Sequence, residues 1–122
     1  MPIHSFHHPS ENLTIHRVEG NVTFDQIRST LVQFYSGSPT KNTLWDLTGG
    51  TIETLSTELV EDLSRVVKEF APLRTGGKTA WVAPRDEDFG LCRMSEIFGS
   101  DLPLKLYVFR EMAEAREWLN NE

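Results

Sequence analysis

The hydrophobic residues of this chain switch repeatedly between the spacing of a strand and the spacing of a helix. Residues 13–19 alternate as in a half-buried strand, whereas the apolar residues of 24–35 recur every three or four positions, as on one face of a helix. Strand-like and helix-like runs then take turns to the end of the chain. Because parallel strands are joined by helices in this order, the pattern predicts an α/β fold with a largely parallel sheet.

Nine elements are expected along the chain. The expected strands cover residues 3–8, 13–19, 43–47, 79–83 and 104–109. The expected helices cover residues 24–35, 56–70, 86–98 and 111–120. Turn-forming residues join the first two strands, which predicts an antiparallel hairpin ahead of the parallel part of the sheet.

Two of the helix starts carry capping signals. Thr23 and Gln26 have the spacing of a capping box, and Asp25 places a negative charge where the helix dipole favours it. Ser56 precedes the amphipathic run of the second helix and can accept a hydrogen bond from a free backbone N–H.

Length and composition narrow the class of protein. A chain of 122 residues is expected to form one domain, 1–122, with residues 1–12 as a peripheral strand and turn. A net charge of −6 argues against nucleic acid as a partner. Cys92 is the only cysteine, which excludes an internal disulfide and a cysteine zinc cluster. Without an export signal or a membrane-spanning apolar run, we expect a cytoplasmic location and no membrane span.

The run Gly-Gly-Lys-Thr at 76–79 matches only the end of a phosphate-binding P-loop. The full motif needs a glycine where Pro72 stands, and it needs a helix rather than a strand to follow. We therefore interpret 76–79 as a turn that leads into a strand.

All four histidines lie near the N-terminus. His4 and His8 share one face of the first expected strand, and His16 could lie across from them, a spacing that can hold a transition metal. The alternative is an exposed edge hairpin in which neutral imidazoles face water. No carboxylate or cysteine is fixed beside these histidines by the sequence, which favours the surface interpretation.

Two acidic positions could meet beyond the carboxyl ends of the parallel strands. Asp46 ends one such strand, and Asp86, Glu87 and Asp88 follow another, so together they could chelate Mg²⁺. Carboxylates at a helix start are also favoured by the helix dipole alone, and Asp46 can instead accept hydrogen bonds from loop amides.

A nucleophile with an associated base is not visible in the sequence. Cys92 lies on an expected amphipathic helix, where a cysteine is most often a small buried hydrophobe. No serine stands in a GxSxG elbow. We therefore do not expect an enzyme.

The connection between the strand at 43–47 and the next helix is long and rich in hydroxyl groups. A phosphate on Ser56 or Thr57 would meet free backbone donors and the positive end of the helix dipole, so a phosphorylation switch is physically reasonable there. The simpler interpretation is that Ser56 only caps the helix.

Three segments resemble the SpoIIAA-like family, which belongs to the wider group of STAS (anti-sigma-factor antagonist-like) domains. They are the strand Leu44–Leu47, the strand Lys78–Val82 and the C-terminal run Val108–Leu119. The resemblance covers about residues 13–120. It implies a single α/β domain with a mixed, mostly parallel sheet of four or five strands flanked by about four helices, and it implies no cofactor.

The resemblance also implies where partners bind. STAS domains recognise protein partners through the loop and helix after the central strand, and some carry an Asp-Ser-Ser-Gly motif whose serine accepts phosphate. Aligning the central strand through Asp46 and Leu47 puts Ser56 on the acceptor position, while the other residues of that motif are replaced here. The residues expected to form the phosphoacceptor and interaction loop are Asp46, Gly49, Gly50, Thr54, Ser56 and Thr57.

Three functions follow as hypotheses. The first is a non-catalytic STAS-like module that binds a protein partner, such as a serine kinase or another regulator, and that is compatible with a homodimer. The second is a carrier or sensor of a small hydrophobic ligand held between helices and sheet. The three Trp and seven Phe of the chain could line such a site. The third is a metal-dependent hydrolase that uses Asp46 with Asp86 and Asp88.

Overall fold

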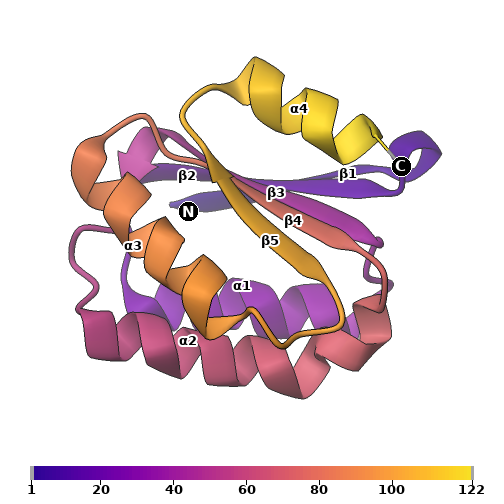
Figure 1. Ribbon diagram of the computed structural model, residues 1–122, viewed down its shortest axis with the longest axis horizontal. Helices are drawn as coiled ribbons and strands as arrows, with labels where there is room; N and C mark the ends of the chain where they lie inside the picture. The colour runs from indigo at the N-terminus through magenta and orange to yellow at the C-terminus, as the bar shows by residue number, and fades with distance from the viewer. Residues whose placement is uncertain (1, 122) are drawn as a thin grey trace.

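A five-stranded sheet runs through the middle of the molecule, in the spatial order β1-β2-β3-β4-β5 (Figure 1). This computed structural model describes residues 2–121. The strands are β1 (Ile3–His8), β2 (Leu13–Asn21), β3 (Asn42–Thr51), β4 (Lys78–Val82) and β5 (Lys105–Phe109). β1 pairs antiparallel with β2, and every other neighbouring pair is parallel. The predicted α/β fold with a mixed, mostly parallel sheet is therefore confirmed.

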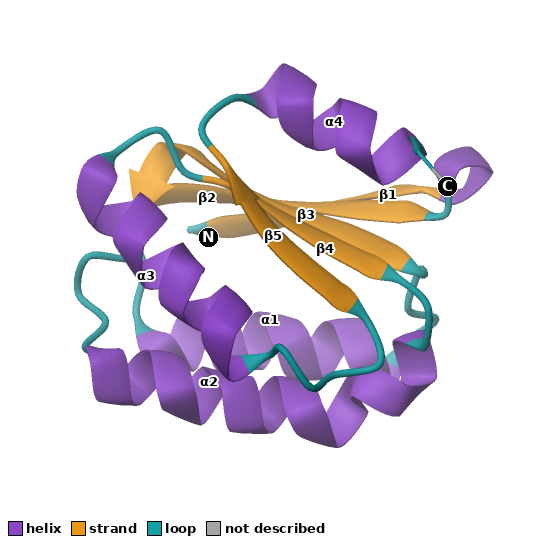
Figure 2. Ribbon diagram, in the orientation of Figure 1, coloured by secondary structure: helices purple, strands orange, loops and turns teal. Residues whose placement is uncertain are grey.

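Four α-helices within the described residues cover the two faces of the sheet unequally. They are α1 (Phe24–Ser36), α2 (Thr57–Phe70), α3 (Asp86–Phe98) and α4 (Met112–Asn120). Helices α1, α2 and α3 lie on one face, and α4 lies on the other (Figure 2). Among residues 2–121, no helix combines the length and the apolar character needed to traverse a bilayer.

Alternation along the strands gives the sheet two separate cores. On β3, Trp45 and Leu47 pack with α1, α2 and α3, whereas Leu44 packs under Ala115 and Leu119 of α4. Successive strand residues point to opposite faces, so one strand supplies both cores. The core beneath the three helices is the larger one, and it holds the site described below.

The predicted capping residues begin their helices. Thr23 and Gln26 form a capping box in which each side chain bonds the other residue's backbone N–H. Ser56 caps α2 by accepting a hydrogen bond from the N–H of Leu59 at 3.2 Å. These short polar side chains satisfy backbone donors that have no partner inside the helix.

Strands β2 and β3 extend further than their glycines indicate. The sequence predicts that β3 ends at Leu47, but Gly49 and Gly50 pair with Glu19 and Gly20 of β2 after a β-bulge. That prediction was wrong because we took the glycines to end the strand, since glycine usually weakens one. Here the missing side chain permits a close approach, since a Cβ on Gly50 would lie 2.7 Å from the carbonyl oxygen of Val18.

Candidate functional site

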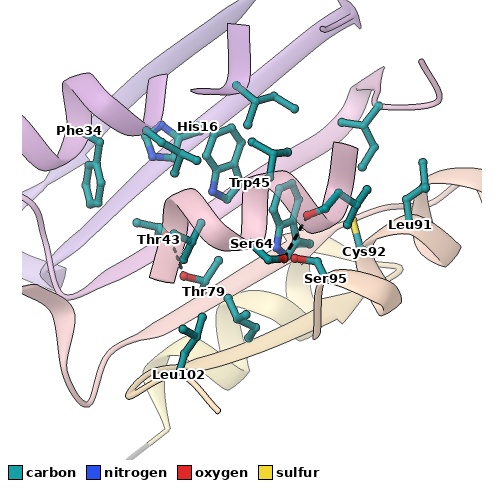
Figure 3. Close-up of a pocket in the computed structure, with 18 of the residues that line it drawn as sticks. His16, Phe34, Thr43, Trp45, Ser64, Thr79, Leu91, Cys92, Ser95 and Leu102 are labelled. Carbon is teal, nitrogen blue, oxygen red and sulfur yellow. Dashed lines mark hydrogen bonds between the residues drawn. The ribbon is translucent and has the colours of Figure 1, made fainter. Parts of the chain in front are cut away.

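A cavity lies between the sheet and helices α1, α2 and α3 (Figure 3). About 50 Å³ of it is open to the centres of water-sized molecules, which is room for several waters; a ring fits only where the surrounding side chains move apart. Strands β2 to β5 form its floor, and the three helices form its walls. A space of this kind among packed elements is unusual, because protein interiors hold few voids larger than a water molecule.

An aromatic row crosses the floor of this cavity. His16 on β2, Trp45 on β3 and Trp81 on β4 occupy matching positions of neighbouring parallel strands. The rings of Trp45 and Trp81 stack with centroids 5.2 Å apart, and His16 lies 4.4 Å from Trp45. Parallel pairing in register places such side chains on one face at the strand spacing. The middle of the floor is therefore a row of aromatic rings held by three strands.

The walls are mostly aliphatic. Helix α2 contributes Val60, Leu63 and Val67, and α1 contributes Ile27 and Leu31. The stripe of apolar residues on α2 was predicted from the helical period, and it faces the sheet as that period requires. An apolar ligand in this space would therefore be surrounded by the same kinds of side chain as a residue in the protein core.

Two polar atoms in this region are buried without a hydrogen-bond partner. They are Nε2 of His16 and Nε1 of Trp81, and both residues line the cavity. His16 is 1% exposed, and its other ring nitrogen, Nδ1, lies 2.8 Å from Oγ of Ser5. Buried polar groups are nearly always paired, so two orphans on one cavity wall point to something that occupies the space.

His16 is held in its neutral form. Burial lowers the pKa of His16 from 6.5 to about 3, and the positive charge of Arg74 and then of His7 adds to the shift. A neutral imidazole carries one proton, so Nε2 is either a donor or an acceptor, according to which atom carries the proton in the bond to Ser5.

A buried arginine stands at the end of the cavity where β3 and β4 begin. Arg74, the last residue of the 3₁₀ turn Ala71–Arg74, is only 4% exposed. Its Nη1 donates to Oη of Tyr35, and its Nη2 donates to Oγ1 of Thr79. The hydroxyl groups of Thr43 and Thr79 lie 3.0 Å apart beside it. This end of the cavity is therefore polar, whereas the rest is apolar.

The single cysteine also lines the cavity. Burial raises the pKa of Cys92, and the negative charges of Asp88 and Glu96 raise it further. The group is therefore a neutral thiol at pH 7. The prediction that Cys92 is a small buried hydrophobe on a helix is confirmed, because the residue is 1% exposed on α3.

The hydroxyl residues of the predicted interaction loop lie at the opposite end of α2 from Arg74. Ser56 is exposed at the N-terminus of this helix. Thr54 donates from Oγ1 to the carbonyl of Val22, and Thr57 points its hydroxyl at Sδ of Met94 at 3.8 Å. Of these three hydroxyls, that of Ser56 is the one used in the N-cap.

The remaining predicted loop residues belong to strand β3. Asp46 accepts hydrogen bonds on Oδ1 from both the backbone N–H and the hydroxyl of Thr48, as the local alternative predicted. Gly49 and Gly50 lie in the paired extension of β3 rather than in a loop, which corrects the sequence expectation. Together with Arg85 they border an open groove at the carboxyl ends of β2 and β3.

The acidic residues proposed for magnesium take separate partners. Asp86 pairs with Arg110 at 2.7 Å, and the buried Asp88 accepts from the hydroxyl of Thr51 and the N–H of Ile52. Within residues 2–121, no group of three or more histidine, cysteine or acidic side chains is arranged to hold a metal ion. The structure therefore does not bring these carboxylates together.

The histidines do not converge either. Ser5 lies directly opposite His16 in the antiparallel pair, so His16 shares the face of Ser5, and His4 and His8 share the other face. The alternative prediction, that the imidazoles face water, was wrong for His16. β2 is an internal strand with both faces covered, and the face that carries His16 packs against Phe34 of α1.

Sequence reasoning missed Arg74 and Trp81 as site residues, and it considered His16 only as a ligand for a transition metal. Trp81 was expected within the strand at 79–83, and His16 within the alternating strand at 13–19. The signal that could have linked the ring-bearing residues is their position at the centre of three expected strands, 13–19, 43–47 and 79–83. In the structure these central positions pair with one another. Arg74 had no such signal, because its partners lie more than 30 residues away, apart from Lys78 and Thr79.

In comparisons with known proteins, no family model matches the chain and no curated protein matches it with significance.

Proposed function

We propose that this domain binds a small, mainly apolar molecule in the cavity between the sheet and helices α1 to α3. The observation that carries the proposal is the pair of unpartnered polar atoms, Nε2 of His16 and Nε1 of Trp81, on the wall of a mostly apolar space. An unsatisfied buried donor or acceptor costs about 1–3 kcal/mol, so a ligand that pairs with either atom recovers stability as it binds.

The lining favours an organic ligand over trapped water. A buried water usually makes about three hydrogen bonds, whereas most of this cavity is bounded by aliphatic and aromatic carbon. The stacked rings of Trp45 and Trp81 offer their apolar edges to a ring or a short alkyl chain. Ligand pockets commonly have this composition, with few polar groups that fix the orientation.

The same geometry supports binding rather than catalysis. Ser5 and His16 form a hydroxyl–imidazole pair, but a pKa of about 3 makes His16 a very weak base that cannot activate the serine at pH 7. Cys92 stays a thiol, because burial and nearby carboxylates disfavour the thiolate. We therefore infer a carrier or sensor of a small molecule.

Native mass spectrometry and a toluene titration test this function. We expect freshly purified protein to carry a small co-purifying mass, and we expect toluene to quench tryptophan fluorescence and raise the melting temperature of ligand-free protein. Ser64→Leu fills the cavity wall on α2 and should abolish both responses, whereas Glu69→Leu on the exposed side of the same helix should keep them. No co-purifying mass together with no response to toluene would overturn the proposal.

A second candidate function is the binding of a protein partner at the carboxyl end of the sheet. It is favoured by the exposed Ser56 at the start of α2 and by the groove that Gly49, Gly50 and Arg85 border. The resemblance to SpoIIAA-like proteins supports the same surface. Phosphopeptide mapping of protein isolated from its native cells tests the switch, with Ser56→Ala as control. Absence of phosphate on the peptide that contains Ser56 would contradict the switch.

A further inference from the structure

We propose that the ligand of the cavity carries a carboxylate group and that Arg74 receives it. This inference rests on the proposed function and adds the chemical class of the ligand: a small aromatic or short-chain acid, with its apolar body over Trp45 and Trp81. Three observations carry it, namely the burial of Arg74, the absence of an acidic partner for it and the polar groups that surround it.

The guanidinium of Arg74 is bound entirely to neutral acceptors. Its Nε donates to the carbonyl of Lys41, Nη1 donates to the hydroxyl of Tyr35, and Nη2 donates to the carbonyl of Lys78 and the hydroxyl of Thr79. A guanidinium has five N–H groups, and these four bonds leave one on Nη1. The side chain is thus fixed in place with one donor to spare.

The positive charge of Arg74 is not compensated within the part of the chain that the structure describes. Nine ion pairs join described residues, and none includes Arg74. Removing an arginine from water without an anion is expensive, and buried charges are normally paired. Because Arg74 lines the cavity, a ligand inside it can supply the missing negative charge without a change of fold.

The groups around Arg74 suit a carboxylate. The hydroxyls of Thr43 and Thr79 lie on the same cavity wall, and the indole N–H of Trp81 is an unused donor further along it. When Nδ1 of His16 accepts from the Ser5 hydroxyl, the single ring proton is on Nε2, which is then a second unused donor. A carboxylate brings one charge against one guanidinium, whereas a phosphate dianion would bring two into a small apolar space.

A matched set of three probes separates this inference from the proposed function. Toluene, phenylacetamide and phenylacetate share one ring and differ in the group attached to it. Calorimetry at pH 7 should show phenylacetate binding to ligand-free wild-type protein at least about tenfold more tightly than phenylacetamide, because the charged group gains the stronger hydrogen bond to Arg74. Phenylacetate should also shift the side-chain N–H resonances of Arg74 and of the Trp81 indole.

A variant checks that the preference comes from Arg74. Arg74→Met should remove the preference for phenylacetate and keep the binding of toluene, and Arg74→Lys should restore part of the preference. Equal or weaker binding of phenylacetate than of phenylacetamide to the wild-type protein overturns the inference even if the variants fail to fold, and it leaves the cavity proposal standing. Failure of all three probes to bind, together with no co-purifying mass, overturns the proposed function and the inference together.

Discussion

Oγ of Ser5 lies 2.8 Å from Nδ1 of His16, which joins an exposed hydroxyl on the edge strand β1 to an imidazole that is 1% exposed on β2. This contact fixes the ring while its other nitrogen lies on the cavity wall. Since the hydroxyl can donate or accept, the edge strand offers the imidazole a partner in either tautomer. The folded protein therefore keeps the imidazole of His16 neutral at pH 7.

The first prediction concerns the pH dependence of stability. The folded protein holds the pKa of His16 near 3 against 6.5 in the unfolded chain, so between these values the unfolded chain binds more protons. The contribution of His16 is complete above pH 6.5 and is lost as the pH falls toward 3. From pH 7 to pH 5 the free energy of unfolding should drop by about 2 kcal/mol from this group.

Urea denaturation at both pH values measures this difference. His16→Gln should flatten the dependence, whatever its effect on stability at pH 7. Cys92→Ala disturbs the same cavity without removing a group that titrates between pH 5 and 7, so it should keep the wild-type difference. A His16 imidazole resonance that titrates near pH 6.5 in the folded protein would contradict the prediction.

The second prediction concerns the reactivity of the thiol. Because Cys92 is buried and its pKa is raised, iodoacetamide should modify the folded protein slowly and the urea-unfolded protein rapidly. The control is a Ser56→Cys, Cys92→Ala variant, whose thiol stands at an exposed position. Mass spectrometry should show the control reacting more than about tenfold faster under native conditions. Equal rates would show that the cavity wall opens freely.

The third prediction compares two glycines. In Gly50→Ala the new Cβ would lie 2.7 Å from the backbone and side chain of Val18, so the parallel pair β2–β3 must shift. We expect a loss of about 1–3 kcal/mol in the free energy of unfolding. Gly90 lies in α3 with open space around it, and Gly90→Ala should stabilise the protein by about 0.5–1 kcal/mol. Thermal unfolding of both variants tests this prediction. Similar melting temperatures would contradict the close approach of Gly50 to Val18.

The fourth prediction concerns the cap of α2. Ser56→Ala removes the acceptor for the Leu59 N–H and should cost about 1 kcal/mol. Ser56→Asp keeps an acceptor and adds a negative charge at the positive end of the helix dipole, so it should match or exceed wild-type stability. Urea denaturation at pH 7 compares the two, and wild-type stability in Ser56→Ala would mean that the cap contributes little.

The elements of the fold could be predicted because they depend on local spacing. The helical stripe of α2, the capping box of Thr23 and the N-cap at Ser56 each involve residues within four positions of one another. The end of β3 could not be predicted in this way. Whether Gly50 breaks or continues a strand depends on Val18 of the neighbouring strand, which local sequence does not describe.

The candidate site was less predictable because it is assembled from distant segments. Both faces of β2 are covered, so the alternation of Leu13 and Thr14 does not tell which face meets three helices and which meets one. Arg74 would be expected at the surface on composition alone, since arginines are rarely buried. Its burial follows from acceptors at Lys41 and Tyr35, which only the folded chain brings to it.

Helix α2 belongs to both candidate sites. It begins at the exposed Ser56, and its inward face, with Val60, Leu63 and Val67, walls the cavity. A helix moves largely as a rigid body, so a molecule that pushes on this face also displaces the capped end. If a ligand in the cavity changes the affinity of a partner for Ser56, the partner changes the affinity of the ligand by the same factor. Helix α2 is thus the structural element that connects the interior cavity with the exposed surface at Ser56.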